Sequence, residues 1–207
     1  MFTPRVATGQ LRLSGTATAS LFVHLVDIGY GVEESTGLMV GAEGAASWPS
    51  RLAVAVRAAG GSLSTDATGA EDRKVGELGA QASFGPAKWL VLFGSALSRV
   101  YSTAVASQRW NTVELGAQAH ADFATMPVRA VLQGGIFPVV SVHGLPKPDV
   151  AFTGAAGLEY RRGSVTGAVF YELERYDFPD SGSGRRLEQV NKLTLRFSVR
   201  LRNGEAR

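Results

Sequence analysis

Hydrophobic and polar residues alternate along most of this chain with a period of two, the spacing of a β-strand whose neighbouring side chains point to opposite faces. The pattern is clearest near the C-terminus, where Leu193, Leu195, Phe197, Val199 and Leu201 share one face and polar or basic residues occupy the other. Almost no segment has apolar residues at the i, i+3, i+4 and i+7 positions of an amphipathic helix. The pattern therefore predicts strands throughout.

Ten strands are expected. Eight alternate cleanly, near residues 10–24, 38–48, 52–57, 77–84, 113–123, 152–160, 165–174 and 192–202. The other two lie at 88–100 and 128–140, and their facing stays open because residues 89–93 are apolar on both sides and Pro138 interrupts the second.

The connections between these strands alternate between short and long. The short ones lie near 47–50, 85–88, 124–127 and 161–164, and the long, polar ones near 25–35, 65–75, 101–110, 142–150 and 178–188. In an up-and-down meander alternate connections fall at opposite ends, so an even strand number places both termini at the short-turn end. We predict an all-β fold, a closed up-and-down antiparallel barrel over residues 10–202, with tails at 1–9 and 203–207.

Composition narrows the possible chemistry. The chain has 207 residues, 21 basic and 18 acidic, for a net charge of +3, and its basic residues form only doublets. A nucleic-acid partner is therefore not expected. The absence of cysteine removes disulfides, thiolate nucleophiles and cysteine metal sites. No apolar stretch approaches the roughly 18 residues of a transmembrane helix.

Taken together, these features resemble a small bacterial outer-membrane β-barrel over residues 10–201. That resemblance implies strands that span the outer membrane, short periplasmic turns, long extracellular loops, a polar lumen and aromatic girdles at both interfaces. It also implies membrane lipid as a partner and a signal peptide removed or truncated from this chain. The implied girdle residues are Trp48, Phe84, Trp89, Phe123 and Tyr160 beside the short turns, and Tyr30, Tyr101, Trp110, Tyr176 and Phe178 beside the long loops.

The apolar faces should point toward lipid, because they are rich in Gly and Ala, which would fill a soluble core poorly. A soluble barrel, with the two faces exchanged, is the alternative. Since lipid leaves no sheet edge unpaired, the first strand should pair with the tenth. The polar network predicted for the lumen comprises Arg12, Glu43, Arg57, Glu77, Glu114, Asp122, Glu159, Glu172, Glu174, Lys192, Arg196 and Arg200.

Both signs of charge occur in this network, so its members can pair across the lumen. A ten-stranded barrel is also far narrower than an open porin. We predict a lumen plugged by ion pairs and hydrogen bonds in preference to a narrow selective path.

Catalytic motifs are weak. Neither His24, His120 nor His143 has a metal-ligand spacing to another ligand residue. A loop-rim hydrolase could use His24 with Asp27, or His143 with an acid and a hydroxyl, drawn from Asp149, Asp177, Asp180, Ser102, Ser107 and Ser141.

We predict no enzyme, cofactor or metal, and a barrel that anchors an assembly or recognises a partner through its long loops. The alternatives are a narrow channel or small-ligand-binding barrel that uses the charged lumen, or a soluble ligand-binding barrel.

Overall fold

Ten β-strands account for almost the whole of the described chain in a computed structural model, which describes residues 11–66, 71–180 and 184–201. Each strand is 13 to 16 residues long, enough to cross a bilayer at a tilt with residues to spare. Their bounds are β1 Arg12–Asp27, β2 Val32–Ser47, β3 Leu52–Thr65, β4 Arg73–Ala87, β5 Leu90–Ser102, β6 Ser107–Asp122, β7 Val128–Val142, β8 Val150–Arg162, β9 Val165–Asp177 and β10 Leu187–Leu201.

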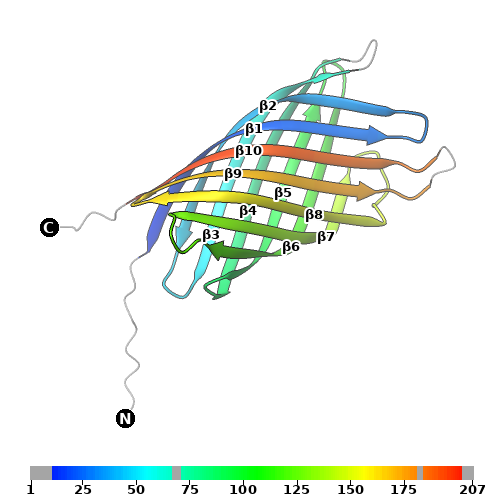
Figure 1. Ribbon diagram of the computed structural model, residues 1–207. Coiled ribbons are helices and arrows are strands. Elements are labelled where there is room, and N and C mark those ends of the chain that lie inside the picture. Colours follow the sequence, from blue (N-terminus) through cyan, green and yellow to red (C-terminus); the bar gives the residue numbers. More distant parts are fainter. Residues whose placement is uncertain (1–10, 67–70, 181–183, 202–207) are drawn as a thin grey trace.

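The strands form one closed antiparallel barrel in which each strand pairs with its neighbours in sequence, and β1 pairs with β10 (Figure 1). The closing ladder runs from Leu13 opposite Leu201 to Asp27 opposite Leu187. Since it extends the length of both strands, the described sheet has no free edge there. The predicted closed ten-stranded barrel is confirmed.

The apolar faces of the strands point outward. Exposed large apolar side chains come from every strand, and on β10 they include Leu193, Leu195 and Phe197. Polar residues of the opposite parity on the same strand, such as Lys192 and Thr194, are buried inside. An apolar surface that encircles a barrel cannot face water, so this belt is suited to lipid. The arrangement is the opposite of the one that a soluble barrel requires.

The structure settles the facing of the two ambiguous strands. On β5, Phe93, Leu97, Arg99 and Tyr101 point inward and are buried. On β7 the inward parity changes at Pro138, from Phe137 before it to Val140 and Val142 after it. The β6–β7 register shifts at the same place, since Leu115 faces Ile136 but Val113 faces Val139. Pro138 thus lies in a β-bulge, where its missing N–H costs no ladder bond.

The segments at the loop end are shorter than the sequence suggested. They span 28–31, 66–72, 103–106, 143–149 and 178–186, against 48–51, 88–89, 123–127 and 163–164 at the other end. The strand ends here are polar on both faces, as at Glu33 and Glu34, so hydrophobicity alone could not distinguish them from loops. The predicted tails lie outside the described residues.

No helix in the described part of the chain is long and apolar enough to cross a bilayer, a finding that concerns helices alone.

Candidate functional site in the barrel lumen

Four charged side chains meet across the middle of the lumen and are called the central charge cluster: Glu77 of β4, Arg99 of β5, Glu174 of β9 and Lys192 of β10. Arg99 donates from Nε to Glu77 Oε1 at 2.6 Å and from Nη1 and Nη2 to the two carboxylate oxygens of Glu174, both at 2.8 Å. Lys192 Nζ donates to Glu77 Oε1 at 2.9 Å. Because β5 and β9 are not neighbours, Arg99 forms a strut across the barrel.

The cluster is balanced in charge and largely buried. Its two cations face two carboxylates, and the Arg99 side chain is 2% exposed. The fork of a guanidinium suits the bidentate grip on Glu174, whose second oxygen also accepts a hydrogen bond from Tyr176 at 2.9 Å. The ring of Phe22 lies 5.6 Å from Arg99 Cζ and 5.3 Å from Lys192 Nζ. Removing either partner of such a pair would leave a buried charge uncompensated.

A cluster of apolar side chains, here called the aromatic plug, fills the lumen between the central charge cluster and the loop end. On four strands a plug residue lies two positions from a cluster residue in the direction of the loops, as Tyr176 does from Glu174. Tyr176 packs on Trp110 and Phe137, with ring centroids 5.0 and 5.3 Å apart. The plug comprises Phe22, Met39, Leu63, Val75, Tyr101, Trp110, Phe137, Val140, Val142, Tyr176, Phe178 and Val190.

Four aromatic residues predicted for the loop-side membrane interface belong to this plug instead, and that part of the prediction is wrong. Tyr101, Trp110, Tyr176 and Phe178 are only 5%, 2%, 1% and 2% exposed. On the strands the reason is parity, because Tyr176 shares the inward face of β9 with Glu174 and Trp110 shares that of β6 with Glu114. Proximity to a loop indicated the height of these rings but not the direction in which they point.

The remaining predicted girdle residues lie on the outside. Tyr30 is exposed in the segment between β1 and β2, and the others are exposed at or beside the short turns: Trp48, Phe84, Trp89, Phe123 and Tyr160. Their function at a membrane interface stays a prediction.

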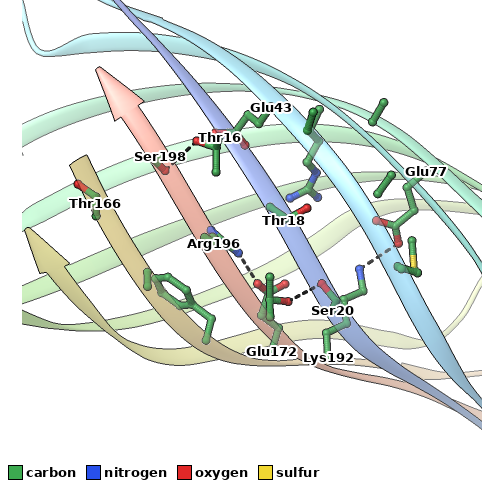
Figure 2. Close-up of a pocket in the computed structure, with 18 of the residues that line it drawn as sticks. Thr16, Thr18, Ser20, Glu43, Glu77, Thr166, Glu172, Lys192, Arg196 and Ser198 are labelled. Carbon is green, nitrogen blue, oxygen red and sulfur yellow. Dashed lines mark hydrogen bonds and ion pairs between the residues drawn. The ribbon is translucent and has the colours of Figure 1, made fainter. Parts of the chain in front are cut away.

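On the short-turn side of the central charge cluster the lumen is hollow. This cavity, here called the vestibule, has a volume of about 260 Å³ and is floored by Glu77 and Lys192. Arg57 and Glu43 line it, and Figure 2 shows Glu172 of β9 and Arg196 of β10 meeting as an ion pair in its wall. Paired hydroxyls tie β1 to β10, including Thr16 Oγ1 with Ser198 Oγ at 2.9 Å.

The vestibule continues to the short-turn end of the barrel. A second hollow of about 220 Å³ is lined by Arg12, Arg161 and Arg200, and it shares Thr166 and Ser198 with the vestibule. Arg12 and Arg200, predicted for the lumen network, therefore lie at its mouth, outside the central charge cluster. The lumen of the described barrel is closed toward the loops and open toward the short turns.

The other predicted lumen residues pair locally. Glu114 accepts a hydrogen bond from Ser95 at 3.1 Å, and its second carboxylate oxygen is buried without a partner in the described chain. Asp122 pairs with Arg129 at the exposed rim, and Glu159 pairs with Arg161. Arg99, the residue that connects the central charge cluster, is absent from the sequence-based set.

Within the described residues, His24 pairs with a residue other than the Asp27 that the sequence suggested. His24 Nε2 lies 2.9 Å from Glu188 Oε2, and both side chains are buried. Asp27, its expected partner, instead accepts a hydrogen bond from the Gly29 amide at 2.8 Å. His143 is exposed. Among the described residues no group of three His, Asp or Glu could hold a metal ion.

No family model matches the sequence, and no curated protein matches it. Solved structures do. Outer membrane protease OmpT from Escherichia coli matches with a TM-score of 0.57 at 9% identity, over 97% of this chain and 98% of that one. This chain has the fold of an outer-membrane β-barrel.

Two further outer-membrane barrels match with lower scores. The translocator domain of autotransporter NalP from Neisseria meningitidis has a TM-score of 0.49 at 13% identity, covering 96% of this chain and 90% of that one. Neisserial surface protein A has a TM-score of 0.41 at 12% identity, covering 90% and 97%. OmpT is a protease, but a shared barrel fold does not transfer an activity, which depends on the site.

Proposed function

We propose that the protein is an integral outer-membrane barrel without enzymatic activity and without a through-channel, which anchors an assembly or recognises a partner at the membrane surface. The outward apolar belt supports the membrane location, and the fold shared with OmpT supports the outer membrane. In such barrels the short turns are periplasmic, which would place the vestibule on the periplasmic side and the aromatic plug toward the outside.

The closed lumen is the observation that carries this proposal. An ion crossing the barrel would have to displace both the aromatic plug and the central charge cluster. The plug consists of packed side chains from many strands, and the cluster holds Arg99 by three hydrogen bonds. Neither group is a flexible loop that could swing aside, so an open state would have to break buried ion pairs.

Recognition is supported by apolar side chains at the loop end. Ile28, Tyr30 and Val105 are exposed in the segments that connect β1 to β2 and β5 to β6, beyond the ends of the strands. Exposed apolar groups beyond the strand ends are available to a protein partner. With short loops, such contacts would come from a compact rim and not from long flexible arms.

Conductance in planar bilayers tests the closed lumen. We expect the wild-type barrel to give no single-channel steps. A variant that combines Tyr176→Ala and Trp110→Ala with Arg99→Ala removes two rings of the aromatic plug and the residue that spans the central charge cluster, and it should give steps if it remains folded. Folding is checked by the mobility of unboiled protein on a denaturing gel. Ohmic steps from the wild-type barrel would contradict the proposal.

Such steps would instead support a narrow channel or a small-ligand-binding barrel. The vestibule favours this second function, because Arg57 and Glu43 line it without an ion-pair partner in the described chain. Under this alternative, the wild-type barrel conducts, and a variant in which Arg57 is replaced should have a lower conductance.

A further inference from the structure

Polar side chains interrupt the apolar outer face of the barrel near its loop end, and one such patch lies on β5, β6 and β7. Ser98 faces Asn111 and Asn111 faces Ser141 in the ladder, so the three form one row across three strands. In the next row toward the loops, Val100 faces Arg109, whose carbonyl oxygen accepts a hydrogen bond from the His143 amide at 2.9 Å. Polar groups on a lipid-facing surface are costly unless they have partners.

Arg109 is the unusual member of this patch. It points outward, it is exposed, and it has no ion-pair partner in the described part of the chain. Arg175, another outward arginine of a strand, lies 3.7 Å from Asp177. Arg109 together with His143, Ser107, Asn111, Ser141 and Val100 lines a hollow of about 330 Å³ that contains no carboxylate. The residues that line this hollow therefore supply no anion to pair with Arg109.

An apolar hollow of about 500 Å³ adjoins it on the side away from the loops. Its floor follows one row of the ladder, in which Ala80 faces Ala96 and Ala96 faces Val113. The two alanines make the depression, and larger side chains such as Val56, Leu78 and Val139 flank it. Asn111 and Ser141 line both hollows, so the apolar groove leads directly into the basic one.

We propose that these joined hollows bind one phosphate-bearing lipid of the leaflet at the loop end. The guanidinium of Arg109 and the imidazole of His143 bind the phosphate by charge-assisted hydrogen bonds. Asn111 and Ser141 meet the carbonyl and hydroxyl groups where a lipid changes from polar to apolar, and one acyl chain lies over Ala80 and Ala96. The order of basic, neutral polar and apolar groups from the loops toward the midplane matches the order of groups in such a lipid. The inference rests on the membrane location in the proposed function.

Native mass spectrometry of the detergent-solubilised barrel tests this site. The probes are phosphatidylglycerol, the bis-phosphorylated lipid A and inorganic phosphate, each added alone. We expect the wild-type barrel to retain one lipid, and Arg109→Gln to lower the affinity about tenfold, the effect of losing a hydrogen bond to a charged group. Arg175→Gln is the matched control, because Arg175 is an outward arginine on β9 that lines neither hollow, and this variant should bind as the wild type does.

Ala96→Phe supplies an independent test, because it fills the apolar hollow, leaves every charge in place and presents an acceptable side chain to lipid. We expect it to weaken lipid retention as Arg109→Gln does. Equal retention by wild type, Arg109→Gln and Ala96→Phe would overturn the site. Binding of inorganic phosphate as tight as that of either lipid, unaffected by Ala96→Phe, would also overturn it in favour of a free-anion site.

The gel mobility of unboiled samples separates this failure from failure of the membrane proposal. A barrel that folds in detergent and shows the heat-dependent shift, but retains no lipid, contradicts only the lipid site. A chain that folds in plain buffer without detergent contradicts the membrane location itself.

Discussion

Arg99 connects opposite walls of the barrel through a single side chain. It is bound to a neighbouring strand through Glu77 and to a distant one through Glu174, in a part of the lumen with almost no solvent. In such surroundings an ion pair contributes little compared with an apolar replacement of both partners, whereas losing one partner is costly. The cluster should therefore matter most for specifying how the far walls approach each other.

Replacing Arg99 by Met should destabilise the barrel by about 3–5 kcal/mol, because it leaves two buried carboxylates facing only Lys192. The measurement is urea unfolding in lipid vesicles, followed by tryptophan fluorescence. Arg129→Met is the control, since Arg129 pairs with the exposed carboxylate of Asp122 and should have little effect. Equal, small changes in both variants would show that the cluster carries no such cost.

Most lumen residues could be predicted from parity alone, and the failures at this scale have separate causes. Glu77 lies between Gly76 and Leu78, and Glu174 lies opposite in parity to Tyr171 and Leu173, so the inward direction of both followed from period two. Arg99 follows a stretch that is apolar on both faces, which concealed its direction. Tyr176 lies at an inward parity, but its nearness to a loop favoured a girdle interpretation. Which inward charges meet across the lumen depends on barrel closure and register, and period two contains no information on either.

At the level of strands, three ladder positions pair an inward glycine with an inward aromatic ring, and the first of them is Gly37 with Phe22. Gly116 faces Phe93 and Gly157 faces Phe170. A Cβ added to Gly157 would lie 2.4 Å from Phe170 Cδ1, so the ring covers the bare backbone of the neighbouring strand. On the neighbouring strand β10, the Cζ atom of Arg196 lies 4.4 Å from the centroid of the Phe170 ring. Glycine here permits a close approach that joins β8, β9 and β10 in one stack.

Gly157→Ala should therefore destabilise the barrel by about 1–3 kcal/mol, the usual cost of overpacking. The readout is the temperature at which the gel shift of unboiled protein is lost. Gly154→Ala on the same strand is the matched control, because the nearest atom to its added Cβ would be the Gln133 carbonyl oxygen, 3.9 Å away. If both variants lose the shift at one temperature, the ring does not require the glycine.

Strand prediction succeeded where one face was uniformly apolar and failed at the strand ends and at the bulge. β10 alternates from Lys192 to Leu201, so the identity and facing of that part were clear from the residues. On β7 the bulge at Pro138 changes the inward parity within one strand, which no single alternating pattern can represent. Near the loops, ladder hydrogen bonds continue through residues that are polar on both faces, because backbone pairing does not depend on hydrophobicity.

The barrel as a whole is asymmetric along its axis. The aromatic plug and the central charge cluster occupy the loop-end part of the lumen, whereas the vestibule and its arginine-lined mouth occupy the short-turn part. A solute could therefore enter from one side and meet a closed floor at Glu77 and Lys192. Such a barrel is open at the short-turn end and closed at the loop end. Chemical labelling can distinguish it from a pore, because a pore admits solutes from both ends.

Because the chain contains no cysteine, a single introduced thiol reports access without background. Thr18, which lines the vestibule, and Val105, exposed beyond the end of β5, are the two test positions. In oriented proteoliposomes a charged, membrane-impermeant thiol reagent should modify Thr18→Cys only from the short-turn side and Val105→Cys only from the loop side. Adding Tyr176→Ala, Trp110→Ala and Arg99→Ala to Thr18→Cys should open the second route, because these changes remove two rings of the aromatic plug and the residue that spans the central charge cluster. Equal labelling of Thr18→Cys from both sides without those changes would mean that solutes pass the aromatic plug. The barrel would then be a channel and not closed at the loop end.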